Sequence, residues 1–205
     1  MPVHLSVACI AVLLGGGAAG AAALRSENES GYVPSARIEL GTNHEIVLVF
    51  LGASFCGASQ RKGFDEVVEQ GKILLSNQAK KDGRTFRTIG VALDWDTDKG
   101  IEFLEEFGRF DEIAAGGNWG SDPAIKYIWR DLPGRSAVPQ IVILERQIEE
   151  TPRATEVTRE VVLRRLHGIE EIESWVANGA RVSFGAATPK EAGSISGKDP
   201  LVQGT

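Results

Sequence analysis

The chain has 205 residues, with 22 Lys and Arg, 28 Asp and Glu, and a formal net charge of -6. Its 42% hydrophobic and 24% charged residues are typical of a globular protein, and exclude a wholly disordered chain, a disulfide-stapled miniprotein and a polytopic membrane protein. An acidic chain without a Lys/Arg cluster is unsuited to binding nucleic acid. The 3 scattered His and 2 Cys exclude a His/Cys zinc site. We therefore predict no nucleic acid partner, no metal and no cofactor.

The N-terminal residues have the pattern of a targeting segment. Residues 5–24 carry no charged side chain, and a first apolar part is followed by small residues that end in Ala21–Ala23, an A-x-A cleavage pattern. We therefore predict a signal peptide over residues 1–23, a linker over 24–35 and an exported protein, periplasmic or secreted. The alternative is an uncleaved membrane anchor, because about 20 uncharged residues are enough to cross a bilayer.

The predicted cleavage leaves a single thiol in the mature protein. Cys9 lies inside the signal peptide, so Cys56 remains alone. A lone Cys in an exported protein is buried and inert, bonded to another molecule, or reactive.

Strand and helix patterns alternate through the first half of the chain. Ala36–Leu40 is a candidate short strand, and Glu45–Leu51 is an apolar run typical of a strand covered on both faces. Cys56–Ser59 follows directly, and a long helical pattern comes after it, with Lys72 off its apolar stripe. Phe86–Leu93 is a second buried strand. The members of the apolar stripe are Phe64, Val67, Val68, Gly71, Leu74 and Leu75.

The next segment reads as a loop followed by helices. Asp94–Asp98 has the alternating carboxylates of a calcium loop, but Lys99 occupies the position that needs Gly, so we favour a strand-to-helix loop capped by Thr97 or Asp98. Helices are predicted over Lys99–Phe107 and from Asp122-Pro123, with Asp122 as N-cap. Four aromatic residues in and near this region either line a recognition surface or pack it, and we favour packing. They are Trp95, Trp119, Tyr127 and Trp129.

The remaining residues predict a hairpin, a helix and a tail. A third strand over Gln140–Leu144 is followed by a polar extended turn over Gln147–Thr158 and a fourth strand over Val161–Leu166. Ile169–Val182 is a closing helix, and residues 182–205 are a flexible tail. The order predicts one domain over 36–181, an α/β fold with a mixed sheet and helices on both faces.

This order of elements resembles the thioredoxin-like superfamily. Val47–Ser59 looks like its segment of strand, aromatic residue and Cys-x-x-Cys, although Ser59 replaces the second Cys and Phe55 stands where the family usually has Trp. An added helical stretch containing Tyr127, before Val138-Pro139, is similar to the exported TlpA/ResA-type branch. The resemblance implies a thioredoxin-like fold, a cis peptide at Val138-Pro139 and a groove there for an extended substrate segment.

A single thiol limits the chemistry to monothiol exchange. The positive end of the helix that follows Cys56, with Arg61 and Lys62 in the next turn, would stabilise the thiolate that attacks disulfides. Ser59 can hydrogen-bond that thiolate but cannot release a mixed disulfide, so an external thiol must do so.

We therefore predict an extracytoplasmic monothiol protein whose partners are protein or low-molecular-weight thiols and disulfides, and leave open whether it turns over as an enzyme. Cys56 and Ser59 are the candidate catalytic residues, and Phe55, Val138 and Pro139 are the candidate substrate walls. The alternatives are a non-catalytic binding module that uses the Pro139 groove and a dimer linked through Cys56.

Overall fold

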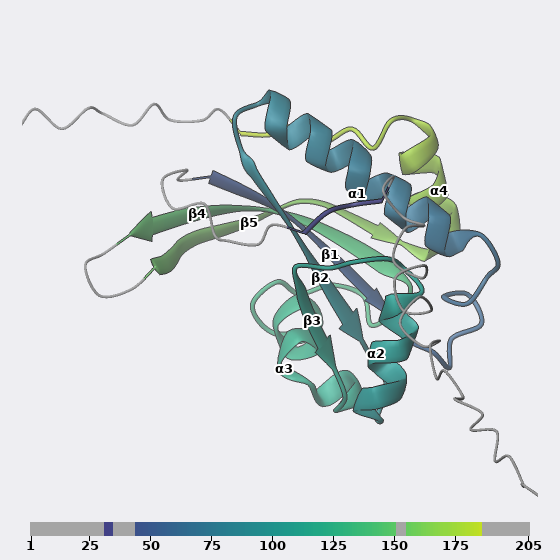
Figure 1. Ribbon diagram of the computed structural model, residues 1–205. Coiled ribbons are helices and arrows are strands. Elements are labelled where there is room, and N and C mark those ends of the chain that lie inside the picture. Colours follow the sequence, from purple (N-terminus) through teal and green to yellow (C-terminus); the bar gives the residue numbers. More distant parts are fainter. Residues whose placement is uncertain (1–30, 35–43, 151–154, 186–205) are drawn as a thin grey trace, which may run out of the picture. The chain divides into compact units, whose positions relative to one another are not determined.

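The computed structural model of the chain describes residues 31–34, 44–150 and 155–185 (Figure 1). The predicted signal peptide, the candidate strand Ala36–Leu40 and the tail after residue 185 lie outside the described residues. The chain divides into units 1–31 and 32–205, and every helix and strand described below belongs to the second. Across the described ranges, no helix has the length and apolar character needed to span a membrane.

Five described strands form one mixed sheet in the order β3-β2-β1-β4-β5. β1, β2 and β3 run parallel, whereas β4 is antiparallel to β1 and β5 is antiparallel to β4. This is the thioredoxin-like mixed sheet that the sequence predicts. The strands are β1 (His44–Gly52), β2 (Thr85–Ala92), β3 (Glu112–Ala115), β4 (Gln140–Glu150) and β5 (Thr155–His167).

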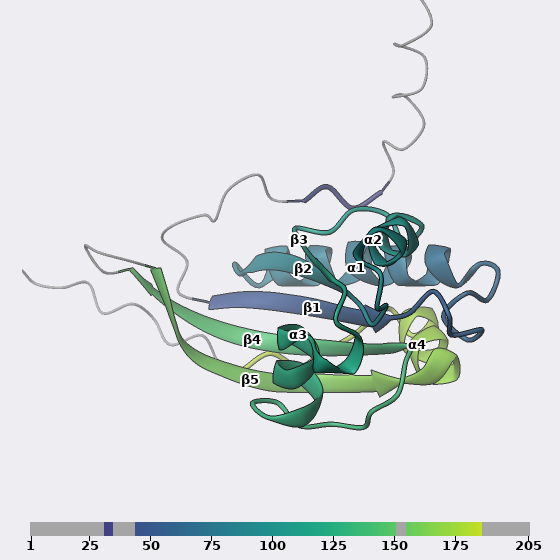
Figure 2. The ribbon, with the colours of Figure 1, turned by 90° about the horizontal axis from the view of Figure 1, so that it is seen from below.

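Helices cover both faces of the sheet, as predicted. Along β1 the side chains alternate, because successive residues of a strand point to opposite faces. Ile46, Leu48 and Phe50 pack with α1, α2 and α4, whereas the odd-numbered residues over 47–51 pack with α3 and η2 on the other face (Figure 2). The helical elements are α1 (Phe64–Lys81), α2 (Thr97–Glu105), the 3-10 turn η1 (Asn118–Gly120), α3 (Asp122–Ala124), the π-helical turn η2 (Ile125–Trp129) and α4 (Gly168–Ala177).

The hairpin of β4 and β5 is longer than predicted. Residues 147–150 pair with residues 155–159, so most of the predicted turn over Gln147–Thr158 is strand. The pairing of β4 with β1 ends at Gln147, so the tip of the hairpin extends beyond the strand that carries the core. The residues of that tip are mainly polar, so a prediction based on apolar strand patterns does not detect these strand ends.

Other element boundaries also depart from the prediction. The sequence does not predict β3, a strand of 4 residues at the edge of the sheet. α4 ends at Ala177, not Val182. The N-cap of α2 is Asp96, whose carboxylate accepts hydrogen bonds from two backbone N–H groups, and the N-cap of α3 is Ser121 instead of Asp122.

Lys72 of α1 falls outside the predicted apolar stripe, yet its side chain is fully buried. Its Nζ donates to the carbonyl oxygens of Phe107 (2.6 Å) and Arg109 (2.9 Å), and lies 2.7 Å from Oε2 of Glu69. The ammonium group also lies 4.0 Å from the centroid of the Phe110 ring. Burial lowers the pKa of Lys72, and these contacts hold α1 against the segment that leads into β3.

A line of ion pairs crosses all five strands on the face that carries α3. It joins Glu112 of β3 to Arg87 of β2 (3.4 Å) and Arg87 to Glu45 of β1 (2.9 Å). It continues from Glu45 to Arg146 of β4 (3.6 Å) and from Arg146 to Glu160 of β5 (2.6 Å). We call these five residues the charge ladder. Four of its five side chains are largely shielded from solvent in pairs, whereas Glu112, on the edge strand, is 53% exposed.

Candidate functional site

Cys56 lies in a loop between β1 and α1, and not in the first turn of a helix. α1 begins at Phe64, after Gly63, which has φ 81°. A right-handed helix cannot continue through a residue in the left-handed region, so the single turn closed by the hydrogen bond from Gln60 N to Cys56 O (3.1 Å) stops before α1. The predicted long helix is confirmed as α1, but the residues between Cys56 and Gly63 form a loop and not its first turns.

The thiol of Cys56 nevertheless lies beside the proline loop. It donates a hydrogen bond to the carbonyl oxygen of Val138 (3.5 Å), from which it is separated by 82 positions in the sequence. The Val138-Pro139 peptide bond is cis, as the resemblance implies. Cys56 is half-buried, and both it and Val138 pack against the core cluster on the α3 face. The predicted thiol and the predicted proline loop thus come together.

Hydrogen bonds hold the proline loop at the start of β4. The buried side chain of Gln140 donates to the carbonyl oxygens of Ala137 (2.7 Å) and Arg135 (3.2 Å). Arg165 of β5 in turn donates to Oε1 of Gln140 (2.9 Å). Gln140 was predicted only as the first residue of a strand, and a polar residue that opens an apolar strand was the available signal.

His167 also lies close to the proline loop. It pairs with Gln140 across β4 and β5, and the backbone N–H of Gly168, the next residue, donates to the carbonyl oxygen of Pro139 (2.8 Å). Burial lowers the pKa of His167, so its ring is neutral at neutral pH. The proximity of His167 to Pro139 depends on the pairing of β4 with β5, which the sequence alone does not reveal.

The two other candidate residues of the Cys56 loop differ in exposure. Phe55 is 60% exposed, which suits a residue that meets a partner. Ser59 is 1% exposed, and within the described residues its hydroxyl has no hydrogen-bond partner. Arg61, predicted to add positive charge near the thiol, forms an ion pair with Glu173 of α4. The charge of Arg61 is thus partly neutralised by a carboxylate.

Asp94, predicted only as a loop residue, connects three loops at this end of the sheet. It is buried, and its carboxylate accepts hydrogen bonds from the backbone N–H (3.1 Å) and from the hydroxyl of Ser54. Its carbonyl oxygen accepts from the N–H of Asn118 (3.2 Å). The carboxyl ends of neighbouring parallel strands meet at one edge of a sheet. This rule was the signal in the sequence that the residues following β1 and β2 lie close together.

The aromatic residues do not all pack the region as predicted. Tyr127 is buried and Trp119 is half-buried, in line with packing, but Trp95 is 78% exposed and Trp129 is 52% exposed. Trp129 is held by a hydrogen bond from its Nε1 to the carbonyl oxygen of Trp119 (3.1 Å). The packing prediction is therefore wrong for Trp95 and Trp129.

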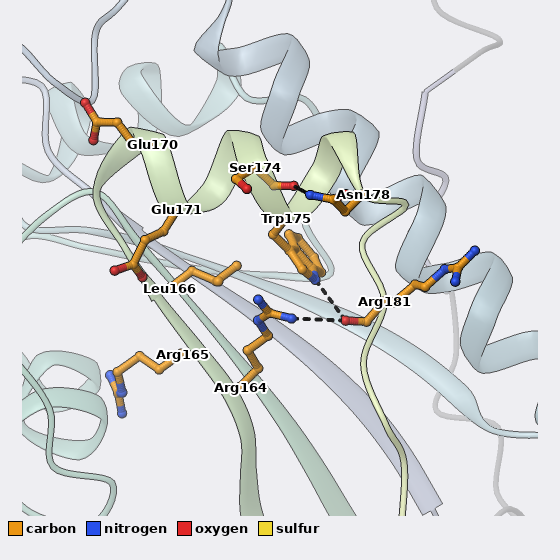
Figure 3. Close-up of a pocket in the computed structure, with 9 residues that line it drawn as sticks. All are labelled: Arg164, Arg165, Leu166, Glu170, Glu171, Ser174, Trp175, Asn178 and Arg181. Carbon is orange, nitrogen blue, oxygen red and sulfur yellow. Dashed lines mark hydrogen bonds between the residues drawn. The ribbon is translucent and has the colours of Figure 1, made fainter.

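A cavity of about 630 Å³ lies elsewhere, between β5 and α4 (Figure 3). The side chains of Arg164 and Trp175 both donate to the carbonyl oxygen of Arg181, at 3.4 Å and 3.2 Å. The guanidinium group of Arg165 points away from the other lining residues (Figure 3). None of the predicted site residues Phe55, Cys56, Ser59, Val138 and Pro139 lines this cavity.

Comparison with protein-family models and with curated proteins finds no match. Among solved structures, the chain is similar to BsSco, a member of the Sco family of cytochrome c oxidase assembly proteins, with 13% identity over 66% of this chain and 78% of that chain and a TM-score of 0.34. A thioredoxin-family thiol:disulfide interchange protein from Chlorobium tepidum TLS has 14% identity over 66% and 79%, with a TM-score of 0.31. ScoI of Arabidopsis thaliana, solved with copper bound, has 11% identity over 66% and 84%, with a TM-score of 0.31.

Likeness at this level does not extend to residue roles or to function. The thioredoxin-like fold rests instead on the strand order, the strand directions and the position of the cis peptide before β4.

Proposed function

We propose that this chain is an extracytoplasmic monothiol redox protein of the TlpA/ResA type, in which Cys56 exchanges with disulfides of proteins or of low-molecular-weight thiols. The observation that carries the proposal is the position of Cys56, half-buried and 3.5 Å from the Val138 carbonyl oxygen at the cis peptide. A cysteine that only fills the core is buried away from solvent, which does not describe this one.

The proposed exchange needs two thiol steps. The Cys56 thiolate, after losing its proton to solvent, attacks one sulfur of a disulfide R–S–S–R′. The Cys56–S–S–R bond forms, the S–S bond of the substrate breaks, and R′–S⁻ leaves with the electron pair. A second thiolate R″–S⁻ then attacks the R sulfur, forms R–S–S–R″ and releases Cys56 as thiolate. Neither step requires a second cysteine in this chain.

The other candidate residues take supporting roles in the proposal. The buried hydroxyl of Ser59 donates to the thiolate once it forms, which satisfies a group that lacks a partner among the described residues. Phe55 covers one side of the reacting sulfur, and Val138 and Pro139 line the other. The bound partner segment lies between these walls.

The exchange can be tested on the native full-length chain by mass spectrometry. We expect glutathione disulfide to add one glutathionyl group to Cys56, added dithiothreitol to remove it, and Cys56→Ser to prevent it. A thiol that reacts with iodoacetamide and glutathione disulfide only after denaturation would overturn the redox proposal. A product of twice the monomer mass, seen only without reductant, would instead identify a Cys56-linked dimer.

A non-catalytic binding module is the second candidate, and one observation favours it. Arg61 is paired with Glu173, so one of the predicted sources of thiolate stabilisation is partly neutralised. In a binding module the Cys56→Ser variant retains all partner binding, whereas a thiol exchanger loses the covalent adduct.

The proposed export rests on residues 1–23 and has its own measurement. Intact mass of the chain isolated from its source should show removal of these residues. An intact N-terminus on chain found in the membrane fraction would identify the anchor, and an intact N-terminus on cytosolic chain would contradict export.

A further inference from the structure

Three aromatic residues near Cys56 are exposed. Phe55 precedes the cysteine, Trp95 follows β2, and Trp129 ends η2, with exposed fractions of 60%, 78% and 52%. Exposed single apolar residues are common on protein surfaces. These three, however, are connected to one another through the buried hydrogen bonds of Asp94.

Asp94 links the loops that carry the rings. Its carboxylate holds Ser54, the residue before Phe55, and its own C-terminal neighbour is Trp95. Its carbonyl oxygen holds Asn118, and the next residue, Trp119, accepts the hydrogen bond from the Trp129 ring. Phe55 and Trp95 are thus next to residues joined by the Asp94 carboxylate, and Trp129 is linked to Asp94 through its backbone carbonyl, Asn118 and Trp119.

The same connections bring the rings to the thiol. Cys56, Val138 and Trp119 all pack against one core cluster, and Trp119 packs edge-to-face on Trp129, with ring centroids 6.2 Å apart. The loops that carry Phe55 and Trp95 are joined by the hydrogen bonds between Ser54 and Asp94, and Trp129 joins them through Trp119. We call Phe55, Trp95 and Trp129 the aromatic rim.

We propose that the aromatic rim selects the disulfide partner of Cys56, and that this partner is a polypeptide whose cysteine has aromatic or aliphatic neighbours. The inference rests on the proposed function, because it names the substrate class of the same thiol. Each aromatic ring can bury about 150–250 Å² against a partner. Glutathione, a charged tripeptide, has no apolar side chain to cover such an area, whereas an apolar polypeptide segment does.

The selectivity can be measured with two neutral peptides, Trp-Cys-Leu and Ser-Cys-Ser, each blocked at both ends and activated as the 2-thiopyridyl disulfide. Attack by Cys56 joins its sulfur to the peptide sulfur and releases pyridine-2-thione, whose absorbance gives the rate. We expect the full-length chain to react about tenfold faster with Trp-Cys-Leu, the effect of burying part of a ring.

Two variants separate the rim from general thiol reactivity. Trp95→Ala should lower the ratio of the two rates severalfold, whereas Ile113→Ala, at an exposed apolar residue on the edge strand β3, should leave both rates unchanged. A loss of thiol reactivity alone would lower both rates and preserve their ratio.

The outcomes distinguish the two proposals. Equal rates for the two peptides, or a ratio that Trp95→Ala does not change, would overturn the aromatic rim while leaving thiol exchange intact. No reaction with either peptide in the native chain would overturn thiol exchange and the aromatic rim with it. Concentration-dependent association of the chain that Trp95→Ala abolishes, with equal peptide rates, would assign the rings to self-association instead.

Discussion

Two serines of the Cys56 loop illustrate what a single hydroxyl contributes in this protein. The hydroxyl of Ser54 donates to the Asp94 carboxylate, whereas the hydroxyl of Ser59 is buried and has no partner in the described part of the chain. A hydrogen bond to a charged group stabilises a fold, while a buried unpaired hydroxyl costs free energy. The cost of a buried unpaired hydroxyl is tolerated more easily where the hydroxyl serves a reaction.

We predict opposite effects for the two alanine variants. Ser54→Ala should lower the free energy of unfolding by about 1.5–3 kcal/mol, because it removes a bond to a carboxylate. Ser59→Ala should leave the free energy of unfolding unchanged or raise it by about 1 kcal/mol, and should slow alkylation of Cys56. Urea denaturation and the rate of iodoacetamide reaction provide the two measurements. Strong destabilisation by Ser59→Ala would show that its hydroxyl has a structural partner.

At the scale of elements, one glycine separates the Cys56 loop from α1. Gly63 has φ 81°, a backbone conformation that costs a residue with a side chain about 1 kcal/mol or more. Gly57, in the same loop, lacks that conformation and has open space where a Cβ would be. The conformation of Gly63 therefore decides that Cys56 belongs to a loop.

We predict that Gly63→Ala lowers the free energy of unfolding by about 1–2 kcal/mol, because alanine must adopt the left-handed conformation. Gly57→Ala is the matched control and should have a much smaller effect. Thermal or urea denaturation measures both. Equal stability of the two variants would mean that the loop does not depend on the conformation at Gly63.

The elements themselves differ in how far sequence predicts them. β1 and β2 were predicted to within one residue at each end, because continuous apolar runs are typical of strands buried on both faces. β3 and the tip of the β4–β5 hairpin were missed, because edge strands and uncovered tips bury little and need no apolar pattern. Their pairing depends on neighbours that are distant in sequence.

At the scale of the whole molecule, the charge ladder ties the five strands together. Glu45 lies at its centre, is 4% exposed and forms ion pairs with both Arg87 and Arg146. Tyr127 of η2 accepts a further hydrogen bond from Arg146 (3.2 Å), and burial raises the pKa of Tyr127 to about 12. Removing Glu45 takes one of two carboxylate partners from each arginine.

We predict that Glu45→Gln lowers the free energy of unfolding by about 1–3 kcal/mol, because Arg87 and Arg146 lose their shared carboxylate and keep only Glu112 and Glu160. Arg130→Gln, which removes the exposed pair with Asp131, is the control and should produce no measurable change. Urea denaturation at neutral pH measures both. An effect of Glu45→Gln as small as that of the control would mean that solvent reaches the ladder.

The candidate site was predicted in part from sequence. The motif around Cys56 and the dipeptide Val138-Pro139 both indicated a thioredoxin-like site, and the structure brings them to 3.5 Å. Asp94 and Gln140 were not singled out, because a buried polar residue has no sequence pattern until its hydrogen-bond partners are known. Lys72 was missed for the same reason.

The sequence by itself determined the order of the described strands and longer helices apart from β3, the single thiol of the candidate site and the serine that replaces a second one. These features depend on residue identity and on local periodicity, and both can be read directly from the amino-acid sequence. Only the tertiary structure decided that a loop separates Cys56 from α1, that Asp94 joins three loops and that Trp95 and Trp129 are exposed. Backbone conformation at one glycine and contacts between distant segments set those features, and both are determined when the chain packs.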